Sequence, residues 1–452
     1  MISRFRRSQL LVSSAICATA CAMAPQAALA GGFALEHQNA AALANAFAGV
    51  EAERGKIAYA AYNPASIAAI TAAEFDISAT GVSLITDYEN ASGALLGVAP
   101  IVGTTKGRGV VPTSVVPNIT IATPIGDRLS IGVIVNSRFG LKTDYGPTSV
   151  VRYQARHSEL STVEISPIAA FKITDAISVG GGMRFQFADL NLSSTIDAGG
   201  IAAASMVPGF LPQTSDLGAT FKANDWAIGY TAGAQIDLSP QFHAGVSWLS
   251  RIDHDFNGEA IFDLAGSGAG QTLNALAGLF AADRFATSIA TPGSVQFGAR
   301  FDASDRFALL ASGKRTFWSS FDVIQLSFND GATPPETVTQ NWSDSWQASF
   351  GGEWKTTSET TLRAGVMWDQ SPVNAAFSHP RVPDGDRFWI GAGLSQAFGE
   401  RVGVDVGIAY AFFKDAHFAL TGAEPENLFR GSFAGDFGFS AVAVSGTLRY
   451  KF

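Results

Sequence analysis

Two short segments of this 452-residue chain bring together residue types that could do chemistry. Asp253-His254-Asp255 contains three potential metal ligands, but in a β-strand the two aspartates point one way and His254 the other, so we interpret the segment as a solvated strand end. Residues 266–272 are glycine-rich but lack the lysine of a phosphate-binding loop, and a flexible loop is the simpler interpretation. The remaining histidines form no recognised pair: His37, His157, His243, His379 and His417. We therefore predict no catalytic residue, no metal site and no cofactor; the protein is not expected to be an enzyme.

Composition excludes further classes of protein. The chain has 39 acidic and 30 basic residues, so it lacks the excess of Lys and Arg with which proteins neutralise nucleic-acid phosphates. Cys17 and Cys21 are its two cysteines, and both lie within the first 30 residues, so the rest of the chain has no disulfide and no Cys-ligated metal. Hydrophobic residues make up 47% of the chain, which must be buried in a core or in a membrane.

The N-terminus has the pattern of an export signal. Arg4, Arg6 and Arg7 precede an apolar stretch over residues 10–23, and Ala28-Leu29-Ala30 fits a cleavage site. We predict a signal peptide over residues 1–30, removed before Gly31. A membrane anchor is the alternative, but the stretch is short for a span of about 20 residues and rich in Ser, Thr and Ala.

Alternating apolar residues dominate the rest of the chain. Trp226, Ile228 and Tyr230 begin one such series, and residues 442–452 form another that ends at the C-terminal Phe. A soluble β-sandwich also alternates, but segments such as 176–196, 241–258 and 305–328 are long enough to cross a bilayer at a tilt. Short turns alternate with long gaps, which is the layout of an outer-membrane barrel.

We therefore predict an all-β fold in which residues 72–452 form a 14-stranded antiparallel transmembrane barrel, with long extracellular loops near 197–224 and 259–284. An even number of strands closes the sheet without an exposed edge. The predicted strands cover residues 73–88, 113–126, 128–142, 158–173, 176–196, 225–238, 241–258, 285–302, 305–328, 340–355, 359–370, 386–399, 401–417 and 435–452. The pattern leaves open whether the following tryptophans face an interfacial girdle or the inner wall: Trp248, Trp318, Trp342, Trp346, Trp368 and Trp389.

Residues 31–71 differ from the predicted barrel because they are Ala-rich and do not alternate. Residues 39–50 suit a short helix, and Asn63-Pro64 suits a fixed turn. We predict that this segment is an N-terminal hatch, a plug packed inside the barrel. A periplasmic extension is the alternative.

Several motifs along the chain match one known family. They are Gly31-Gly32-Phe33, Tyr62-Asn63-Pro64-Ala65, Val116-Pro117-Asn118, Asn136-Ser137-Arg138-Phe139-Gly140-Leu141, Thr316-Phe317-Trp318-Ser319-Ser320-Phe321, Asp369-Gln370-Ser371-Pro372-Val373 and Val382-Pro383-Asp384-Gly385-Asp386-Arg387-Phe388-Trp389. With these motifs the chain resembles, nearly end to end, the FadL-type outer-membrane transporters of long-chain fatty acids and aromatic hydrocarbons. The last two segments, 369–373 and 382–389, together form the most specific block.

The resemblance implies passive capture of a hydrophobic ligand, movement of the hatch, and lateral diffusion through the barrel wall. Phe33, Asn63 and Pro64 would belong to the hatch and its pocket. A kink in the third strand would form the lateral opening, at Asn136, Ser137, Arg138, Phe139 and Gly140. An unbroken strand that ends in a glycine turn is the alternative. An outer apolar groove is implied for two loop clusters: Met206, Val207, Phe210 and Leu211, and Leu273, Leu276, Leu279 and Phe280. Alternatively, these clusters pack only on each other.

The identity of the ligand stays open at this point. Fatty-acid members are expected to offer basic side chains to a carboxylate, yet a rough alignment places Ser194 and Ser343 there, with Arg184, Arg315 and Arg363 as other candidates. The expected partners are a fatty acid or hydrocarbon, outer-membrane lipid and lipopolysaccharide, with no nucleic acid and the protein a monomer. The expected location is the outer membrane of a Gram-negative bacterium. A general diffusion porin for polar solutes is the alternative function.

Overall fold

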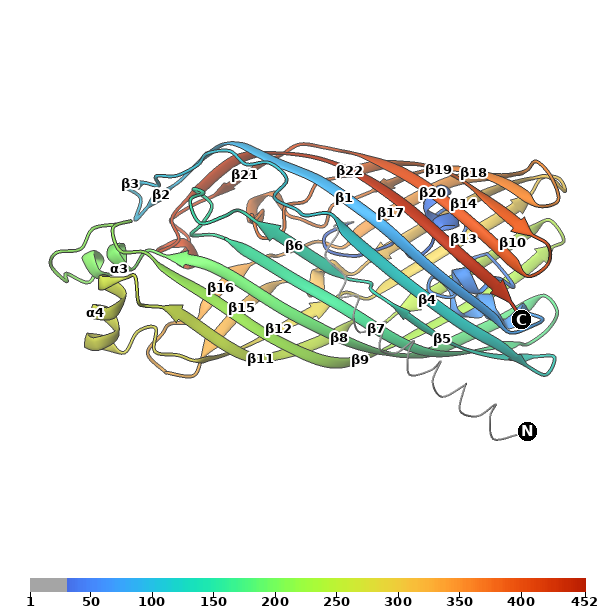
Figure 1. The fold of residues 1–452 in the computed structure, drawn as a ribbon, viewed down its shortest axis with the longest axis horizontal. Helices are drawn as coiled ribbons and strands as arrows, with labels where there is room; N and C mark the ends of the chain where they lie inside the picture. The colour runs from blue at the N-terminus through green and yellow to red at the C-terminus, as the bar shows by residue number, and fades with distance from the viewer. Residues whose placement is uncertain (1–30) are drawn as a thin grey trace.

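A closed antiparallel β-barrel of 14 strands forms the computed structural model, which describes residues 31–452 (Figure 1). The predicted signal peptide lies outside the described residues. The undivided strands are β1 (Glu74–Ser92), β4 (Ser114–Ile125), β7 (His157–Lys172), β8 (Ile177–Ile196), β9 (Leu217–Ser239), β18 (Thr360–Asp369), β19 (Arg387–Phe398) and β22 (Phe433–Lys451). The other positions in the barrel are each made of two pieces: β5 (Leu129–Asn136) with β6 (Gly140–Asp144), β10 (Phe242–Leu249) with β11 (Ile252–Asp263), β12 (Arg284–Thr291) with β13 (Ser294–Asp302), β14 (Phe307–Thr316) with β15 (Val323–Phe328), β16 (Glu336–Thr339) with β17 (Ser345–Lys355), and β20 (Val402–Phe413) with β21 (Ala416–Leu420).

The first and last strands close the ring. β1 pairs with β22 from Glu74 opposite Lys451 to Glu89 opposite Asp436, so the sheet has no unpaired edge. Short turns join the strands at one end, and the longer loops lie at the other with the helices α3 (Ala198–Ala204) and α4 (Gly268–Ala277) (Figure 1). The prediction of fold class is confirmed. β9 begins before the predicted strand, so the first long loop ends at residue 216. Within residues 31–452, no helix has the length and apolar character that a transmembrane helix needs.

The six tryptophans considered above, of eight in the chain, divide evenly between the two faces of the wall. Trp248, Trp346 and Trp368 face outward and are 40–44% exposed, as expected for a belt at a membrane interface. The inner set is Trp318, Trp342 and Trp389, each at most 3% exposed.

Four neighbouring strand positions are interrupted at the same level. The interruptions are residues 250–251, 292–293, 317–322 and 340–344. They lie side by side because Leu249 pairs with Ser294, Ser294 with Thr316, and Thr316 with Ser345. Beyond them, the small sheet of β11, β12, β15 and β16, here called the rim, has a polar outer face that includes Asp253, Asp255, Asn257 and Glu259. The rim therefore stands outside the apolar belt of the barrel.

The Asp253-His254-Asp255 segment was interpreted as a solvated strand end. It lies at the start of β11, the first strand of this rim. Both aspartates are exposed, whereas His254 points inward, is 1% exposed, and contacts Gln186 at 3.0 Å and Asp225 at 3.1 Å. The prediction of a flexible loop over residues 266–272 is wrong, because the helix α4 begins at Gly268. Ser267 caps this helix by accepting a hydrogen bond from the amide of Gly270.

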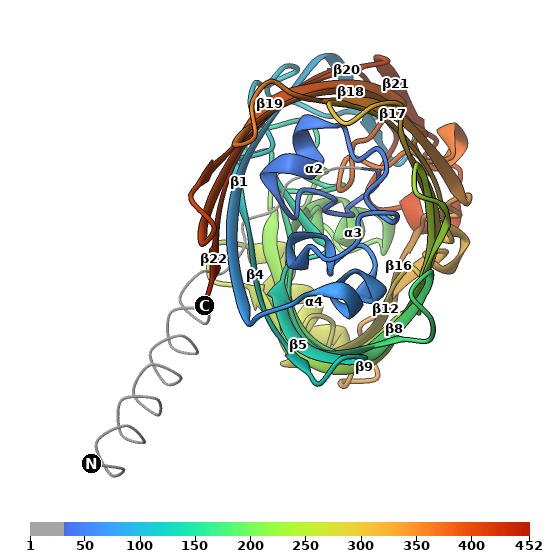
Figure 2. The same cartoon turned by 90° about the vertical axis from the view of Figure 1, so that its right-hand side faces the viewer.

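The hatch, residues 31–71, fills the lumen near the short-turn end (Figure 2). Its helix α2 (Ala40–Ala44) is shorter than the predicted 39–50 and is capped by Asn39. The 3₁₀ helices η1 (Ile57–Tyr59) and η2 (Pro64–Ala69) follow, and Asn63 caps η2 with Pro64 in the first position. Glycines in the wall let the hatch approach closely: a Cβ on Gly391 would lie 2.4 Å from the carbonyl oxygen of Leu43.

Candidate functional site

The third strand of the barrel is broken. β5 ends at Asn136 opposite Glu164 of β7, and pairing resumes where Gly140 of β6 lies opposite Ser161. Residues 137–139 leave the ladder, so their backbone groups need other partners, since unpaired groups inside a membrane are costly. The break, residues 137–139, lies within the five residues predicted for the kink, and the outer two, Asn136 and Gly140, still pair with β7.

The N-terminal end of the hatch supplies these partners. The amide of Leu35 donates to the carbonyl of Arg138 at 2.7 Å, and the amide of Gly140 donates to the carbonyl of Phe33 at 2.9 Å. Ala34 and Phe139 lie opposite each other between these two bonds as an antiparallel bridge. The first residues of the hatch therefore replace the missing part of the wall ladder. We call residues 31–38 the hatch tip.

Side chains reinforce this junction. Gln38 donates to the carbonyl of Ser137 at 2.9 Å and accepts a hydrogen bond from the amide group of Asn136 at 2.9 Å. Arg138 reaches from the break to the carbonyl of Ala61 in the hatch at 2.6 Å and to Glu164 at 3.0 Å. Asn136, Ser137, Arg138, Phe139 and Gly140 thus all contact the hatch, or lie between residues that do.

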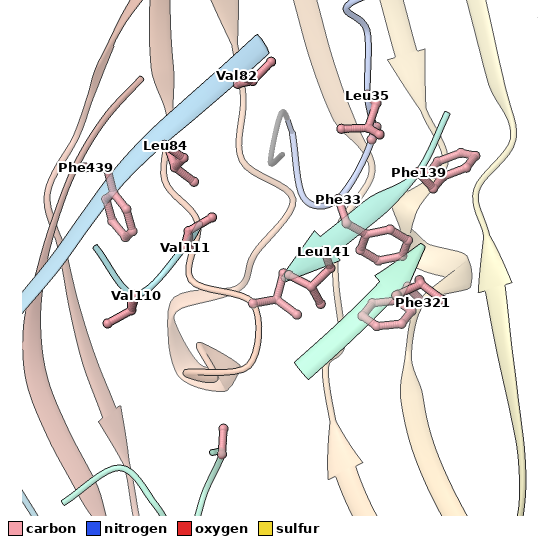
Figure 3. Packing of buried hydrophobic residues seen from close by; sticks show 14 of the residues in the cluster. Phe33, Leu35, Val82, Leu84, Val110, Val111, Phe139, Leu141, Phe321 and Phe439 are labelled. Atoms are coloured by element: carbon pink, nitrogen blue, oxygen red, sulfur yellow. The ribbon is translucent and has the colours of Figure 1, made fainter. Parts of the chain in front are cut away.

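Phe33 sits in an aromatic cage. Its ring centroid lies 4.7 Å from Trp318, 5.1 Å from Phe321, 5.8 Å from Trp342 and 6.0 Å from Phe139, and the residue is 1% exposed. Figure 3 shows Phe33 at the end of the hatch loop, between Phe139 on one side and Phe321 on the other. The tryptophans face inward because they occupy interruptions of the ninth and tenth strand positions. Breaks in three different strands therefore converge on one hatch side chain.

The chain just before Phe33 meets the most specific motif block. The amide of Gly32 donates to Asp384 at 3.0 Å, and a Cβ on Gly31 would lie 3.2 Å from Asp369. Arg387 pairs with both carboxylates, at 3.0 Å to Asp369 and 3.1 Å to Asp384. This block thus helps to position the hatch tip.

The remaining hatch, residues 39–71, is held by ion pairs at the short-turn end. Arg54 pairs with Asp237, and Glu53 pairs with Arg300 at 2.7 Å. Arg300 also binds Glu353 at 2.7 Å, which in turn binds Arg363 at 2.8 Å. Glu53 and Glu353 each bind a second cation, Lys56 and Arg363, so these largely buried groups form one charge network in which loss of a member is costly. We call residues 39–71 the hatch base.

Asn63 and Pro64 belong to this base and lie apart from the cage around Phe33. Asn63 donates to the carbonyls of Glu51 at 2.8 Å and Ala234 at 3.1 Å. Gly180 and Gly233 of the wall leave room for the turn, because a Cβ on Gly180 would lie 2.6 Å from Pro64. Asn63 and Pro64 therefore anchor the hatch to the wall.

Polar contacts join both the hatch tip and the hatch base to β14. Glu36 forms an ion pair with Lys314, and Glu51 accepts a hydrogen bond from the hydroxyl of Ser312 at 2.5 Å. Burial raises the pKa of Glu51 to about 7, against the opposing effects of the Ser312 hydrogen bond and of Lys314. The protonation state of this contact changes near neutral pH.

The basic residues considered for a carboxylate are already paired. Arg184 binds Glu164 at 2.7 Å, and Arg363 belongs to the ion pairs of the hatch base. Arg315 has a side chain that is 39% exposed and lies over the ring of Trp346 on the outer face. Ser343 is exposed, whereas Ser194 is 3% exposed and faces the interior.

The two apolar loop clusters pack partly together. Leu273 and Phe280 are buried between α3 and α4, and Val207, Phe210 and Leu279 cover them. Met206, Leu211 and Leu276 instead point into solvent, with 89%, 66% and 71% of their surface exposed. The structure therefore divides the predicted groove residues into a packed core and an exposed set.

Below these helices, a cavity of about 620 Å³ opens toward the loop end. We call it the vestibule. Its apolar wall is formed by Tyr153, Ile196, Ile201, Phe262, Phe280, Phe328, Pro334, Pro335, Phe377, Pro425 and Phe429, and its polar residues include Ser194, Glu336 and Arg430. Sequence reasoning missed most of these residues. They are distributed over several loops and the inner face of the rim, where no single segment carries a signal.

Comparisons with known proteins support this picture. A family model described as outer membrane protein transport protein (OMPP1/FadL/TodX) matches residues 21–452. The chain belongs to this family. A long-chain fatty acid transport protein of Salmonella typhi is 25% identical over 426 residues, which cover 90% of this chain and 91% of that protein.

Two solved structures show the same fold. A FadL homologue of Pseudomonas aeruginosa has a TM-score of 0.84 at 22% identity, and the match covers 93% of this chain and 100% of the homologue. The toluene transporter TodX of P. putida has a TM-score of 0.65 at 15% identity, covering 92% of this chain and 98% of the other. The OMPP1/FadL/TodX family transports fatty acids or aromatic hydrocarbons in the outer membrane and is a family of transporters, not of enzymes. This member is an outer-membrane β-barrel transport protein, as predicted.

Proposed function

We propose that this protein takes up long-chain fatty acids or aromatic hydrocarbons by passive capture, hatch movement and lateral diffusion through the break in the third strand. The ligand enters past α3 and α4 into the vestibule and displaces the hatch tip. One observation carries the proposal: the tip completes the broken strand through Phe33, Leu35, Arg138 and Gly140. Withdrawal of the tip would open the wall at that point.

Hydrophobic transfer supplies enough free energy for this step. A fatty chain that buries about 14 methylenes at roughly 0.8 kcal/mol each has on the order of 11 kcal/mol available before ordering costs. Each hydrogen bond between tip and wall is worth about 0.5–1.5 kcal/mol, and the Phe33 contacts about 3–5 kcal/mol. A long-chain fatty acid can therefore replace the tip without an external energy source.

The membrane setting forms part of the proposal. We place the loop end outside the cell and the short turns in the periplasm. The exposed Trp248, Trp346 and Trp368 would contact outer-membrane lipid and lipopolysaccharide, and the protein would act as a monomer.

A disulfide lock tests the proposed exit. Ala34 and Phe139 form a non-hydrogen-bonded antiparallel pair, for which the Cα separation is about 4.5 Å and suits a disulfide. Residues 31–452 contain no cysteine, so Ala34→Cys with Phe139→Cys introduces one defined cross-link. We expect oxidation to abolish uptake of labelled oleate and labelled toluene in transporter-deficient cells, and a reductant to restore it.

The single-cysteine variants, expressed at matched surface levels, control for the loss of each side chain. Full uptake by the oxidised double variant would show that the tip does not need to leave the wall. Uptake of small sugars, with no uptake of oleate or toluene, would support a diffusion porin instead.

A further inference from the structure

The vestibule is lined by both apolar and charged side chains. Phe262 contacts Phe280 and Phe328, at ring-centroid distances of 5.5 and 5.7 Å. Arg430, Glu336 and Ser194 line the same cavity. A ligand of matching chemistry has an apolar chain and one polar end.

The charged cluster contains two guanidinium groups and one shared carboxylate. Glu336 lies 3.2 Å from a nitrogen of Arg430 and 3.9 Å from a nitrogen of Arg381. The side chain of Arg381 is only 4% exposed, and its hydrogen bonds go to neutral oxygens, including the hydroxyl of Ser158 at 3.2 Å. Arg381 therefore has no close carboxylate of its own.

Two further observations indicate that the positive charge is incompletely compensated. Nη1 of Arg430 is buried and has no hydrogen-bond partner. Burial, together with the nearby Arg430, lowers the pKa of Arg381 to about 10, although Glu336 acts in the opposite direction. A buried guanidinium without an adequate partner is costly, and an anion would relieve that cost.

The other charged residues around the vestibule have partners or lie in solvent. Glu426 accepts hydrogen bonds from the amide and hydroxyl of Thr339, at 3.0 and 2.9 Å. Glu424 is exposed to solvent. Arg152 pairs with Asp216 and lies over the ring of Tyr153.

We infer that Arg430 and Arg381 bind the carboxylate head of a fatty acid whose chain lies on Phe262, Phe280 and Phe328. This inference rests on the proposed function and selects one of its two ligand classes, the anionic amphiphile over the neutral hydrocarbon. A planar guanidinium matches a carboxylate with two parallel hydrogen bonds. The head group competes with Glu336 for the same donors, so Glu336 limits the affinity.

The test compares ligands that share a hydrocarbon chain and differ in the head group, an anionic carboxylate or a neutral alcohol. Binding of oleate and of oleyl alcohol is measured by calorimetry on the purified full-length protein in a neutral detergent. Arg430→Gln and Arg381→Gln should each weaken oleate binding about 10- to 100-fold, the value of one hydrogen bond to a charged group, and leave oleyl alcohol unchanged. Glu336→Gln should tighten oleate binding several-fold, because the competing carboxylate is lost.

Control variants separate this inference from a purely structural role. Arg315→Gln, on the outer face, should change neither affinity, and Arg430→Lys should keep part of the oleate preference. The inference fails if the Arg→Gln variants weaken both ligands equally, or if Glu336→Gln weakens oleate. If the native protein binds neither ligand, this inference fails together with the fatty-acid half of the proposed function, and uptake of labelled toluene tests the other half. If it binds both equally, only the carboxylate site is wrong.

Discussion

The amide of Gly140 donates a hydrogen bond to the carbonyl of Phe33 at 2.9 Å, although 107 positions separate the two residues in the chain (140 − 33). This bond joins a strand of the wall to a segment that is not part of the barrel. The wall is therefore complete only while the hatch tip is in place. The cage of Trp318, Phe321 and Trp342 holds the tip there.

Phe33→Ala should release the tip without loosening the base. Loss of the buried ring removes about 3–5 kcal/mol of packing locally, whereas the ion pairs of Arg54 and Glu53 remain. Amide hydrogen exchange should become faster over residues 31–38 and stay unchanged over residues 39–71. Equal acceleration in both segments would mean that the hatch moves as one unit.

Arg300→Gln should have the opposite effect. It removes the cation that Glu53 and Glu353 share, so that Glu53 keeps only Lys56 and Glu353 keeps only Arg363, which costs about 1.5–3 kcal/mol. We expect the base to loosen and ion conductance across planar bilayers to rise. The same substitution at the outward-facing Arg315 is the control and should leave conductance at the native level.

Glu51 should make docking of the hatch depend on pH. The carboxyl has a pKa of about 7 when docked and of 4.5 when free, so between these values a free hatch loses its proton while the docked one keeps it. Docking therefore weakens as pH rises from 4.5 to 7, by about 3 kcal/mol in total, and stays weak above pH 7.

Exchange rates over residues 49–54, corrected for intrinsic chemistry, should reveal this dependence when pH 5 and pH 8 are compared. Glu51→Gln should show the same protection at both values. Glu359→Gln, at an exposed turn, should behave like the native protein. A native protein equally protected at pH 5 and pH 8 would contradict the prediction.

The close fit between hatch and wall can be tested at Gly391. A Cβ at this position would lie 2.4 Å from the Leu43 carbonyl and 3.0 Å from that of Ala44, so Gly391→Ala should cost about 1–3 kcal/mol and increase proteolysis near α2. Gly446→Ala is the matched change on β22, where a Cβ meets nothing within 4 Å. The Gly446→Ala variant should be cleaved by protease no faster than the native protein.

Alternation predicted the strands well within the apolar belt but less well beyond it. β9 begins at Leu217, eight residues before the predicted start at 225 (225 − 217). Within the belt its apolar residues, such as Trp226, face lipid. Outside the belt the apolar residues, such as Phe221, face inward. The strand continues beyond the belt, but its apolar residues there occupy the inner face and no longer the outer one. The period-two pattern is interrupted at this change, and the interruption resembles the start of a strand.

The cage could not be predicted from the sequence for a related reason. Trp318 and Trp342 lie where strands are interrupted. The alternation of side chains between the two faces of a strand does not hold there, so it does not predict which way they point. Phe33 and the kink were identified through the family motifs, whereas Arg381 and Arg430 come from two loops that only the folded chain brings to Glu336.

Pairing of β1 with β22 has a consequence for biogenesis. Because β1 pairs with β22, the ring cannot close before both strands are present. The hatch precedes β1 in the chain and packs closely on wall glycines such as Gly391. We therefore expect the ring to close around a hatch that already lies inside it.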